Sequence, residues 1–157
     1  MEHLKIITDI QVCSYEELDD EDRLLVDKAK EMSANAYAPY SRFHVGAALL
    51  LSNGEIVGGA NQENVAFPSG TCAERSAVFY AHAKYPQAKV RKLAVAAGNE
   101  GKGFTDLPTA PCGACRQALL EYEKLAGRPI RILLYGAERT YIVNGVRDLL
   151  PLQFDEF

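Results

Sequence analysis

The sequence has no apolar run long enough to cross a membrane and no recognisable export signal. The longest apolar stretches, such as residues 45–51 (VGAALLL), are far shorter than the roughly 20 residues that a membrane-spanning helix needs. The first ten residues (MEHLKIITDI) contain no basic segment followed by a hydrophobic run and a small-residue cleavage site. We therefore expect a cytoplasmic protein with no membrane partner.

An excess of positive charge is also missing. The 157-residue chain has 17 Lys and Arg against 21 Asp and Glu, a formal net charge of −4, and its basic residues are scattered. Proteins that bind a polynucleotide backbone usually carry a basic patch or stripe. The composition therefore favours a small-molecule partner over a nucleic acid.

Cysteine is scarce, and three of the four cysteines are clustered. Residues 68–77 (PSGTCAERSA) hold one, residues 110–119 (APCGACRQAL) hold two, and Cys13 stands apart as an expected free thiol. In a cytosolic chain of this size a metal or redox site is more common than two disulfide crosslinks. The chain also lacks internal repeats, low-complexity tracts and linkers, so we expect residues 1–157 to form a single domain.

The start of the chain predicts a strand followed by a helix. Apolar residues alternate with mostly polar ones over residues 4–12, which predicts a half-buried strand within an N-terminal extension, residues 1–13. Ser14 and Glu17 form a capping box, the signal for a helix start. That helix should end near Ala38, because Pro39 disfavours a helical conformation in the residue before it. Its apolar stripe consists of Leu25, Ala29, Met32 and Ala36.

The rest of the chain predicts helices that alternate with apolar strands. A hairpin should turn at Asn53-Gly54, and residues 98–109 resemble a loop. Further strands are expected at 92–98, 129–136 and 140–145, and helices at 72–83 and 112–125. This order implies an α/β fold with three layers (α/β/α), a central mixed five-stranded sheet and the N-terminal segment as a candidate extra strand. Ligand sites in such folds lie at strand ends, where helices begin, and both cysteine clusters fall at predicted helix starts.

The two clusters have the spacing of a metal site. Cys112 and Cys115 are three residues apart and lie on nearly one face of a helix, and Pro111 suits its first turn. Cys72 and Glu74 would point in almost opposite directions on the side of a helix, but at its very start both can reach beyond the tip. Three thiolates that converge from two helix starts form a zinc site with one tetrahedral position left over. The positive ends of the helix dipoles favour the thiolate forms.

The ligand count favours an open catalytic zinc site over a closed structural one. A closed site needs a fourth Cys or His, and neither Cys13 nor any of the three histidines has ligand spacing. An open zinc ion lowers the pKa of a bound water toward neutrality, and Glu74 can accept the released proton. Arg75 can offset the negative charge of three thiolates. The alternative for these two residues is an ordinary solvated glutamate and a surface arginine.

Beyond their chemistry, the two clusters resemble a known family. CAER (72–75) and PCGACRQ (111–117) are similar to the homotetrameric, three-cysteine cytidine deaminases and match the zinc-deaminase signature. The resemblance covers nearly everything from about residue 22 to residue 154. Three further motifs are similar to motifs of the family, and all five occur in the family's order along the chain: YAPYSRFHVGAAL (37–49), GANQEN (59–64) and LLPLQF (149–154).

The resemblance implies one zinc ion per subunit and assigns a role to each site residue. The metal ligands would be Cys72, Cys112 and Cys115. Glu74 would carry protons, with Arg75 tuning the charge. The substrate-binding residues would be Asn61 and Glu63 at the ribose hydroxyls, Phe43 near the base, the backbone of Ala73 at the pyrimidine, and Phe154 reaching the pocket from a neighbouring subunit. The chain departs from the family's pattern in the segment before Ser14 and in the generous loop 98–109, which could cover the pocket.

The implied reaction is hydrolytic deamination of cytidine and 2′-deoxycytidine to uridine and 2′-deoxyuridine, a step of pyrimidine salvage. An activated water would add to C4 of the ring, and Glu74 would protonate N3 and then help ammonia to leave. Two other hypotheses stay open. One is a deaminase of another substrate, such as a blasticidin-type nucleoside or a cytosine within a polynucleotide. The other is a non-catalytic binding module stabilised by zinc, which predicts four protein ligands.

Overall fold

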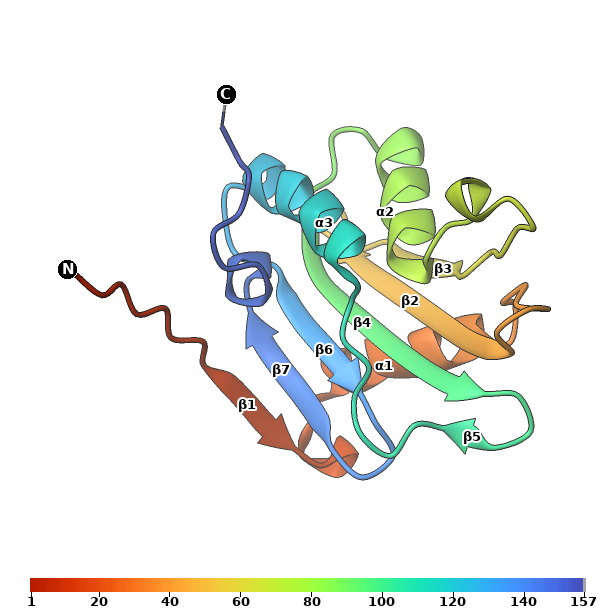
Figure 1. Cartoon of the computed structure of the whole chain (residues 1–157). Helices are drawn as coiled ribbons and strands as arrows, with labels where there is room; N and C mark the ends of the chain where they lie inside the picture. Colours follow the sequence, from red (N-terminus) through yellow and green to blue (C-terminus); the bar gives the residue numbers. More distant parts are fainter. Residues whose placement is uncertain (157) are drawn as a thin grey trace.

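The computed structural model describes residues 1–156, which fold around one mixed sheet (Figure 1). Within this range the sheet has seven strands in the order β1-β7-β6-β4-β2-β3, with β5 paired to β4. Neighbouring strands are antiparallel except for β4 and β6, which are parallel. The strands are β1 (Ile10–Cys13), β2 (Phe43–Leu51), β3 (Ile56–Ala60), β4 (Val90–Asn99), β5 (Gly103–Phe104), β6 (Arg131–Tyr135) and β7 (Thr140–Asn144). The predicted α/β fold with a mixed sheet is confirmed, and two short strands, β1 and β5, extend its five longer ones.

Helices cover both faces of the sheet. Figure 1 shows α1 (Asp20–Ser33) behind the sheet and both α2 (Ala73–Lys84) and α3 (Gly113–Ala126) in front of it. Strand β2 serves both layers because successive side chains point to opposite faces. Leu49 and Leu51 belong to the core under α2 and α3, whereas Ala48 and Leu50 belong to the core under α1. The predicted three-layer arrangement follows from this two-sided burial.

Helix α1 ends at Ser33, so the prediction that it reaches Ala38 is wrong. Pro39 restricts only the residue before it, and a tertiary contact stops the helix earlier. The backbone N–H of Tyr37 donates to the carbonyl of Asn61 at 2.9 Å, and the N–H of Glu63 donates back to Tyr37 at 2.8 Å. Pairing with the segment after β3 therefore draws the chain out of the helix, and Ala36 lies outside the apolar stripe.

The N-terminal segment forms a shorter and more exposed strand than its pattern predicts. Only Ile10–Cys13 is a strand, paired antiparallel with β7. The expected half-burial is wrong, because Leu4, Ile6 and Val12 are all exposed. Residues 1–9 continue away from the body of the molecule (Figure 1). The alternating pattern is typical of a strand, but no other layer of the described residues covers the apolar side chains of this segment.

The remaining predicted elements lie within a few residues of their expected bounds. The hairpin of β2 and β3 turns at Asn53-Gly54, where Gly54 has a φ of +85° that favours glycine. Helix α3 ends at Gly127, also with positive φ (+64°). Loop 98–109 contains β5, which folds back on β4, and the N–H of Thr105 donates to the carbonyl of Ala97 at 2.9 Å. Part of the predicted loop is therefore an extension of the sheet.

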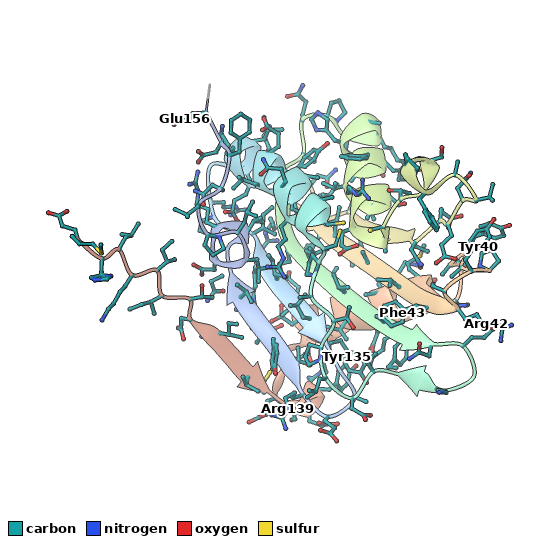
Figure 2. All side chains as sticks on the ribbon, in the orientation of Figure 1. Tyr40, Arg42, Phe43, Tyr135, Arg139 and Glu156 are labelled. Carbon is teal, nitrogen blue, oxygen red and sulfur yellow. The ribbon has the colours of Figure 1, made fainter. Side chains whose placement is uncertain are left out.

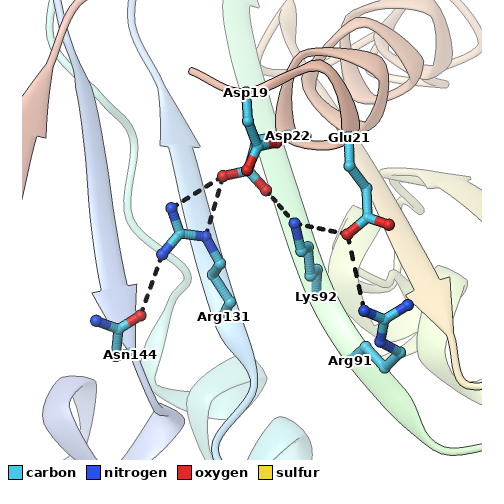
Figure 3. Close-up of polar contacts among 7 residues, drawn as sticks. All are labelled: Asp19, Glu21, Asp22, Arg91, Lys92, Arg131 and Asn144. Carbon is cyan, nitrogen blue, oxygen red and sulfur yellow. Dashed lines mark hydrogen bonds and ion pairs between the residues drawn. The ribbon is translucent and has the colours of Figure 1, made fainter. Parts of the chain in front are cut away.

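A buried cluster of charges ties the start of α1 to the sheet (Figure 3). The carboxylate of Asp22, only 1% exposed, accepts hydrogen bonds from Lys92 Nζ at 2.5 Å and from Arg131 Nε at 3.0 Å. Glu21 also lies 2.7 Å from Lys92 Nζ. Burial opposes the charge on Lys92, but its bonds to the two carboxylates outweigh this effect and raise its pKa. The cluster joins α1 to β4 and β6.

Candidate metal centre and substrate cleft

The two cysteine clusters meet where α2 and α3 begin. Cys72 is the N-cap of α2 and Cys112 is the N-cap of α3, each with extended backbone angles. Cys115 lies in the first turn of α3. A residue at an N-cap can direct its side chain beyond the helix tip, where the unpaired N–H groups make the potential positive. Both helix starts therefore present sulfur to the same volume.

The spacing of the sulfur atoms fits a zinc ion. The Sγ atoms of Cys72, Cys112 and Cys115 all lie within 4.8 Å of one another, and those of Cys72 and Cys112 are 3.7 Å apart. Two thiolates that bind one tetrahedral zinc at about 2.3 Å lie about 3.8 Å from each other. Cys115 is fully buried and Cys112 is exposed, so the cluster opens toward solvent on one side. Within residues 1–156 this group includes no fourth cysteine, histidine or carboxylate.

The electrostatics of the cluster favour binding of a cation. The hydrogen bond with Cys115 lowers the pKa of Cys72 to about 5, assisted by the guanidinium of Arg75. The same hydrogen bond with Cys72, together with burial, raises the pKa of Cys115. One thiolate therefore forms readily and suppresses the ionisation of its neighbour. A divalent cation would remove this conflict by stabilising all three thiolates.

Glu74 lies in the first turn of α2, directly beside the sulfur cluster. Its side chain is only 4% exposed, and this burial is the main cause that raises the pKa of its carboxyl. The negative charge of Cys72 acts in the same direction. A raised pKa lets a carboxyl group hold a proton more readily than an exposed one does, which suits a group that accepts and returns a proton.

Arg75 lies against the sulfur cluster rather than on the open surface. Its Nη2 donates to Cys72 Sγ at 3.7 Å, and its bonds to Cys72 and Cys115 raise its pKa. Its Nε is buried and has no hydrogen-bond partner among the described residues. The guanidinium is therefore held beside the sulfurs as a fixed positive charge.

A cleft of about 520 Å³ opens beside Cys72 and Arg75. Of the residues that the sequence predicts to bind ribose, it includes Asn61 and Glu63. None of its lining residues comes from loop 98–109, so within residues 1–156 that loop does not form a wall of the cleft. The complete lining consists of Tyr40, Ser41, Asn61, Gln62, Glu63, Asn64, Phe67, Gly70, Thr71, Cys72 and Arg75.

The two ribose candidates are held by the start of β2 and by the turn before it. Asn61 Oδ1 accepts from the N–H of Val45 at 2.8 Å, and its Nδ2 donates to the carbonyl of Phe43 at 2.9 Å. Glu63 Oε2 accepts from the N–H groups of Tyr40 at 2.9 Å and Ser41 at 3.2 Å. Hydrogen bonds, led by that of the Ser41 side chain, lower the pKa of Glu63. Each side chain is fixed by these bonds and still has hydrogen-bonding capacity for a ligand.

Tyr40 and Ser41 hold Glu63 in place, a role that the sequence alone did not assign to them. They belong to the turn before β2, beside Arg42, and Figure 2 labels Tyr40, Arg42 and Phe43 around the beginning of that strand. Arg42 has a positive φ of 55°, which is uncommon for a residue other than glycine. The only signal in the sequence was the Pro-Tyr-Ser turn itself, because Glu63 is 22 residues further along the chain.

Three other candidates lie outside the cleft. Phe43 is partly buried at the start of β2, and Ala73 is fully buried in the first turn of α2. Phe154 is 65% exposed and lines a separate hollow beside α3, where Gln117 Nε2 donates to its carbonyl at 2.8 Å. The structure therefore brings Asn61 and Glu63 together with Cys72, whereas the side chains of Phe43 and Phe154 do not line the cleft. Ala73, predicted to contact the pyrimidine through its backbone, lies between Cys72 and Glu74 at the start of α2.

Comparison with known proteins identifies the family of this arrangement. Residues 19–126 match the model of the cytidine and deoxycytidylate deaminase zinc-binding region, a range that includes all three clustered cysteines. The chain is 42% identical over 132 residues to the cytidine deaminase of Halalkalibacterium halodurans, covering 84% of this chain and 92% of that protein. It is 41% identical over 111 residues to the cytidine deaminase of Mycobacterium tuberculosis, covering 69% and 78%.

Solved structures agree. The crystal structure of cytidine deaminase from Burkholderia pseudomallei superposes with a TM-score of 0.69 at 34% identity, over 87% of this chain and all of that one. The crystal structure from Mycobacterium tuberculosis gives a TM-score of 0.67 at 33% identity, over 88% and 100%. This chain belongs to the cytidine and deoxycytidylate deaminase family, and its three-cysteine cluster fits a three-cysteine zinc site. None of its helices, over the residues that the structure describes, could span a membrane.

Proposed function

We propose that this protein hydrolyses cytidine and 2′-deoxycytidine to uridine and 2′-deoxyuridine and releases ammonia. The observation that carries the proposal is a three-sulfur cluster of zinc dimensions, open on one side, with a buried carboxyl beside it and the family match around it. An open site is what a catalytic zinc ion needs, whereas a structural site is closed by a fourth ligand. The alternative of a non-catalytic module predicts such a fourth ligand.

The three thiolates of Cys72, Cys112 and Cys115 would hold the ion. When bound, zinc makes a water molecule acidic enough to act as a nucleophile near neutral pH. Arg75 and the two helix N-termini stabilise the negative charge of the sulfurs. The protein side of the chemistry therefore consists of anchoring the metal, balancing its charge and moving protons.

Glu74 carries the protons. It accepts one from the attacking water and delivers it to N3 of the pyrimidine while the new C4–O bond forms. It then takes the proton of the new C4 hydroxyl group and transfers it to the amino group as the C4–N4 bond breaks, so that C4 becomes a carbonyl, water is consumed and ammonia leaves. The buried position of the carboxyl raises its pKa and makes both transfers feasible.

The ribose end of the nucleoside would bind to Asn61 and Glu63. Hydrogen bonds hold both side chains in place before any ligand arrives, which reduces the entropy lost on binding. A negative Glu63 in the cleft suits paired hydroxyls and repels phosphate. A free nucleoside is therefore favoured over a cytosine within a polynucleotide.

We also propose a homotetramer with shared active sites. Phe154 is exposed and does not line the cleft of its own chain. Gln117, which follows the second cysteine cluster, fixes the backbone of this residue. A neighbouring subunit could therefore receive the ring in a defined position.

The decisive variant is Glu74→Gln, which keeps the size of the side chain and removes its proton transfer. We expect one zinc per subunit, as in the unmodified protein, and a loss of turnover of at least about 10²–10⁴-fold. The matched control is Glu138→Gln at an exposed carboxylate, which should leave turnover unchanged. Ammonia release and metal content provide the two readouts.

Substrate range is tested in the same assay with cytidine, 2′-deoxycytidine, blasticidin S and a short single-stranded oligonucleotide. We expect turnover of the first two only, and loss of activity with a chelator. Near-normal activity of Glu74→Gln would refute the role of that residue, and turnover of the oligonucleotide would refute the nucleoside assignment.

A further inference from the structure

The N-terminal arm, defined here as residues 1–9, carries apolar side chains that the rest of the chain leaves uncovered. Leu4 is 82% exposed, Ile6 51% and Ile7 87%. The arm leaves the body beyond β1 (Figure 1), and Thr8 Oγ1 anchors its base by donating to the carbonyl of Asp148 at 3.0 Å. Burial within this chain therefore does not explain why the sequence places three large aliphatic residues here.

The arm continues from an open edge of the sheet. Strand β1 is the terminal strand in the order of the sheet and pairs with β7 on one side. Its Ile10 and Val12 are 42% and 57% exposed. A terminal strand with unpaired backbone groups and exposed apolar side chains is a template for pairing with another strand. The arm prolongs this template with the same alternation of side chains.

We propose that residues 4–10 pair antiparallel with residues 4–10 of a second copy of this chain, about a twofold axis at Ile7. In this register Lys5 lies opposite the partner's Asp9, and the same ion pair forms twice because the contact is symmetric. Leu4 lies opposite the partner's Ile10 on the other face of the ribbon. Ile7 meets its own counterpart.

Two neighbouring registers, with the twofold axis at Ile6 or at Thr8, would also place opposed side chains on the same face of the ribbon. The charges distinguish the proposed register from these two. A twofold axis at Ile6 would place Lys5 opposite the partner's Ile7 and Asp9 opposite the partner's His3, so that Lys5 faces no opposite charge. An axis at Thr8 would place Asp9 opposite the partner's Ile7. Of these three registers, only the axis at Ile7 pairs Lys5 and Asp9 with opposite charges and Leu4 with Ile10, while Ile6 lies opposite the partner's Thr8.

This pairing would join the sheets of two copies into one continuous sheet. A self-complementary contact about a twofold axis joins copies in pairs, and it leaves a closed assembly where this axis is one of the twofold axes of the proposed homotetramer. The arm is separate from the cysteine cluster and its cleft, so the inference does not rest on the proposed function.

Cysteine scanning across the axis tests the proposal directly. Directly opposed residues in an antiparallel pair have Cα atoms about 4.5–5.5 Å apart, within the 4.4–6.8 Å of a disulfide. Residues next to the axis are offset from their own counterparts by two positions, which places those Cα atoms roughly 8 Å apart. In a Cys13→Ser background with zinc bound, Ile7→Cys should therefore crosslink two chains, whereas Ile6→Cys and Thr8→Cys should not.

Mild oxidation at low micromolar concentration followed by a non-reducing denaturing gel gives the yields. A dimer band that predominates for Ile7→Cys alone is the expected result. A maximum at position 6 or 8, equal yields at all three positions, or no crosslink in the purified protein would each overturn the proposal. The last outcome would mean that the arm binds something other than a second copy.

A charge exchange tests the register independently of folding. Adding Lys5→Glu to Ile7→Cys places like charges opposite each other and should reduce the crosslink yield roughly two- to tenfold. Adding Asp9→Lys as well restores opposite charges and should restore the yield. Failure of the double exchange to recover crosslinking would contradict the pairing of these two residues.

Discussion

Replacing Gly59 by alanine should disturb the metal centre without touching any of its residues. Gly59 lies in β3 directly beneath α2, and a Cβ at this position would lie 2.5 Å from the backbone N of Ala77 and 2.7 Å from the carbonyl O of Ala73. Both contacts are with main-chain atoms, which cannot rotate away. Reaching an ordinary separation of 3.4 Å requires α2 and β3 to move apart by roughly 0.7–0.9 Å.

This displacement is large for a metal site. Helix α2 carries Cys72 at its N-cap and Glu74 in its first turn, and metal–ligand distances tolerate only about 0.2 Å. Overpacking of this kind costs about 1–3 kcal/mol of unfolding free energy, or roughly 2–12 °C in the melting temperature of a chain this long. We expect Gly59→Ala to lose stability in this range and to release zinc to a chelator markedly faster.

Two neighbouring glycines provide matched controls. A Cβ at Gly58 would meet the Met32 side chain, with Cγ at 2.5 Å, and that flexible side chain can move aside. A Cβ at Gly46 would approach the Ala29 carbonyl O to 1.9 Å, which displaces α1 on the face opposite the metal centre. Gly58→Ala should therefore change little, and Gly46→Ala should lose stability with normal zinc release.

Thermal unfolding and chelator-induced zinc release, measured on all three variants, separate the two effects. If Gly59→Ala unfolds and releases zinc as Gly58→Ala does, the close packing of α2 on β3 does not control the geometry of the metal centre. If Gly46→Ala releases zinc as fast as Gly59→Ala, the effect is a general loss of stability instead.

The charges around α1 lead to two further predictions. Asp22→Ala leaves Lys92 without its buried carboxylate and should lower the free energy of unfolding, measured in urea, by about 3–5 kcal/mol. Adding Lys92→Met should recover part of this loss. Full additivity of the two substitutions would show that the two residues do not interact. Asp19 caps α1 by accepting from the N–H of Asp22 at 2.7 Å, and this bond lowers its pKa from an ordinary 3.8. Asp19→Ala should therefore lower the free energy of unfolding by about 1 kcal/mol at pH 7. The difference in stability between the variant and the unmodified protein should vanish as the pH falls through the lowered pKa of Asp19 in the folded state. A difference in stability that stays unchanged down to pH 2 would contradict this explanation.

Features determined by nearby residues could be predicted from the sequence. The hairpin at Asn53-Gly54 and the helix starts at both cysteine clusters depend on contacts a few residues apart. The predicted start of the first helix is wrong, because the capping box of Ser14 and Glu17 closes only a 3-10 turn (Tyr15–Glu17), and α1 begins at Asp20 with Asp19 as its N-cap. The convergence of three sulfurs was also predictable, because each helix start needs only its own local sequence and the α/β fold places such starts at one edge. The chemistry of the centre follows from residue types and spacing.

Features determined by distant contacts could not be predicted. Helix α1 ends five residues early because Tyr37 pairs with a segment more than 20 residues away. The hydrogen bonds that hold Glu63 come from the turn at Tyr40 and Ser41, and no local pattern reveals them. Loop 98–109 contains a strand because β4 offers it an open edge.

The sequence by itself determined which groups are the candidates for binding metal and carrying protons, because thiolates, a carboxyl and a guanidinium have fixed chemistry and lie at local helix signals. Tertiary structure alone decided how those groups are tuned. The burial of Glu74, the sharing of a proton between Cys72 and Cys115, and the exposure of the N-terminal arm depend on what packs against each residue. Burial and charge are sums over neighbours that come from every part of the chain, so only the folded arrangement defines them.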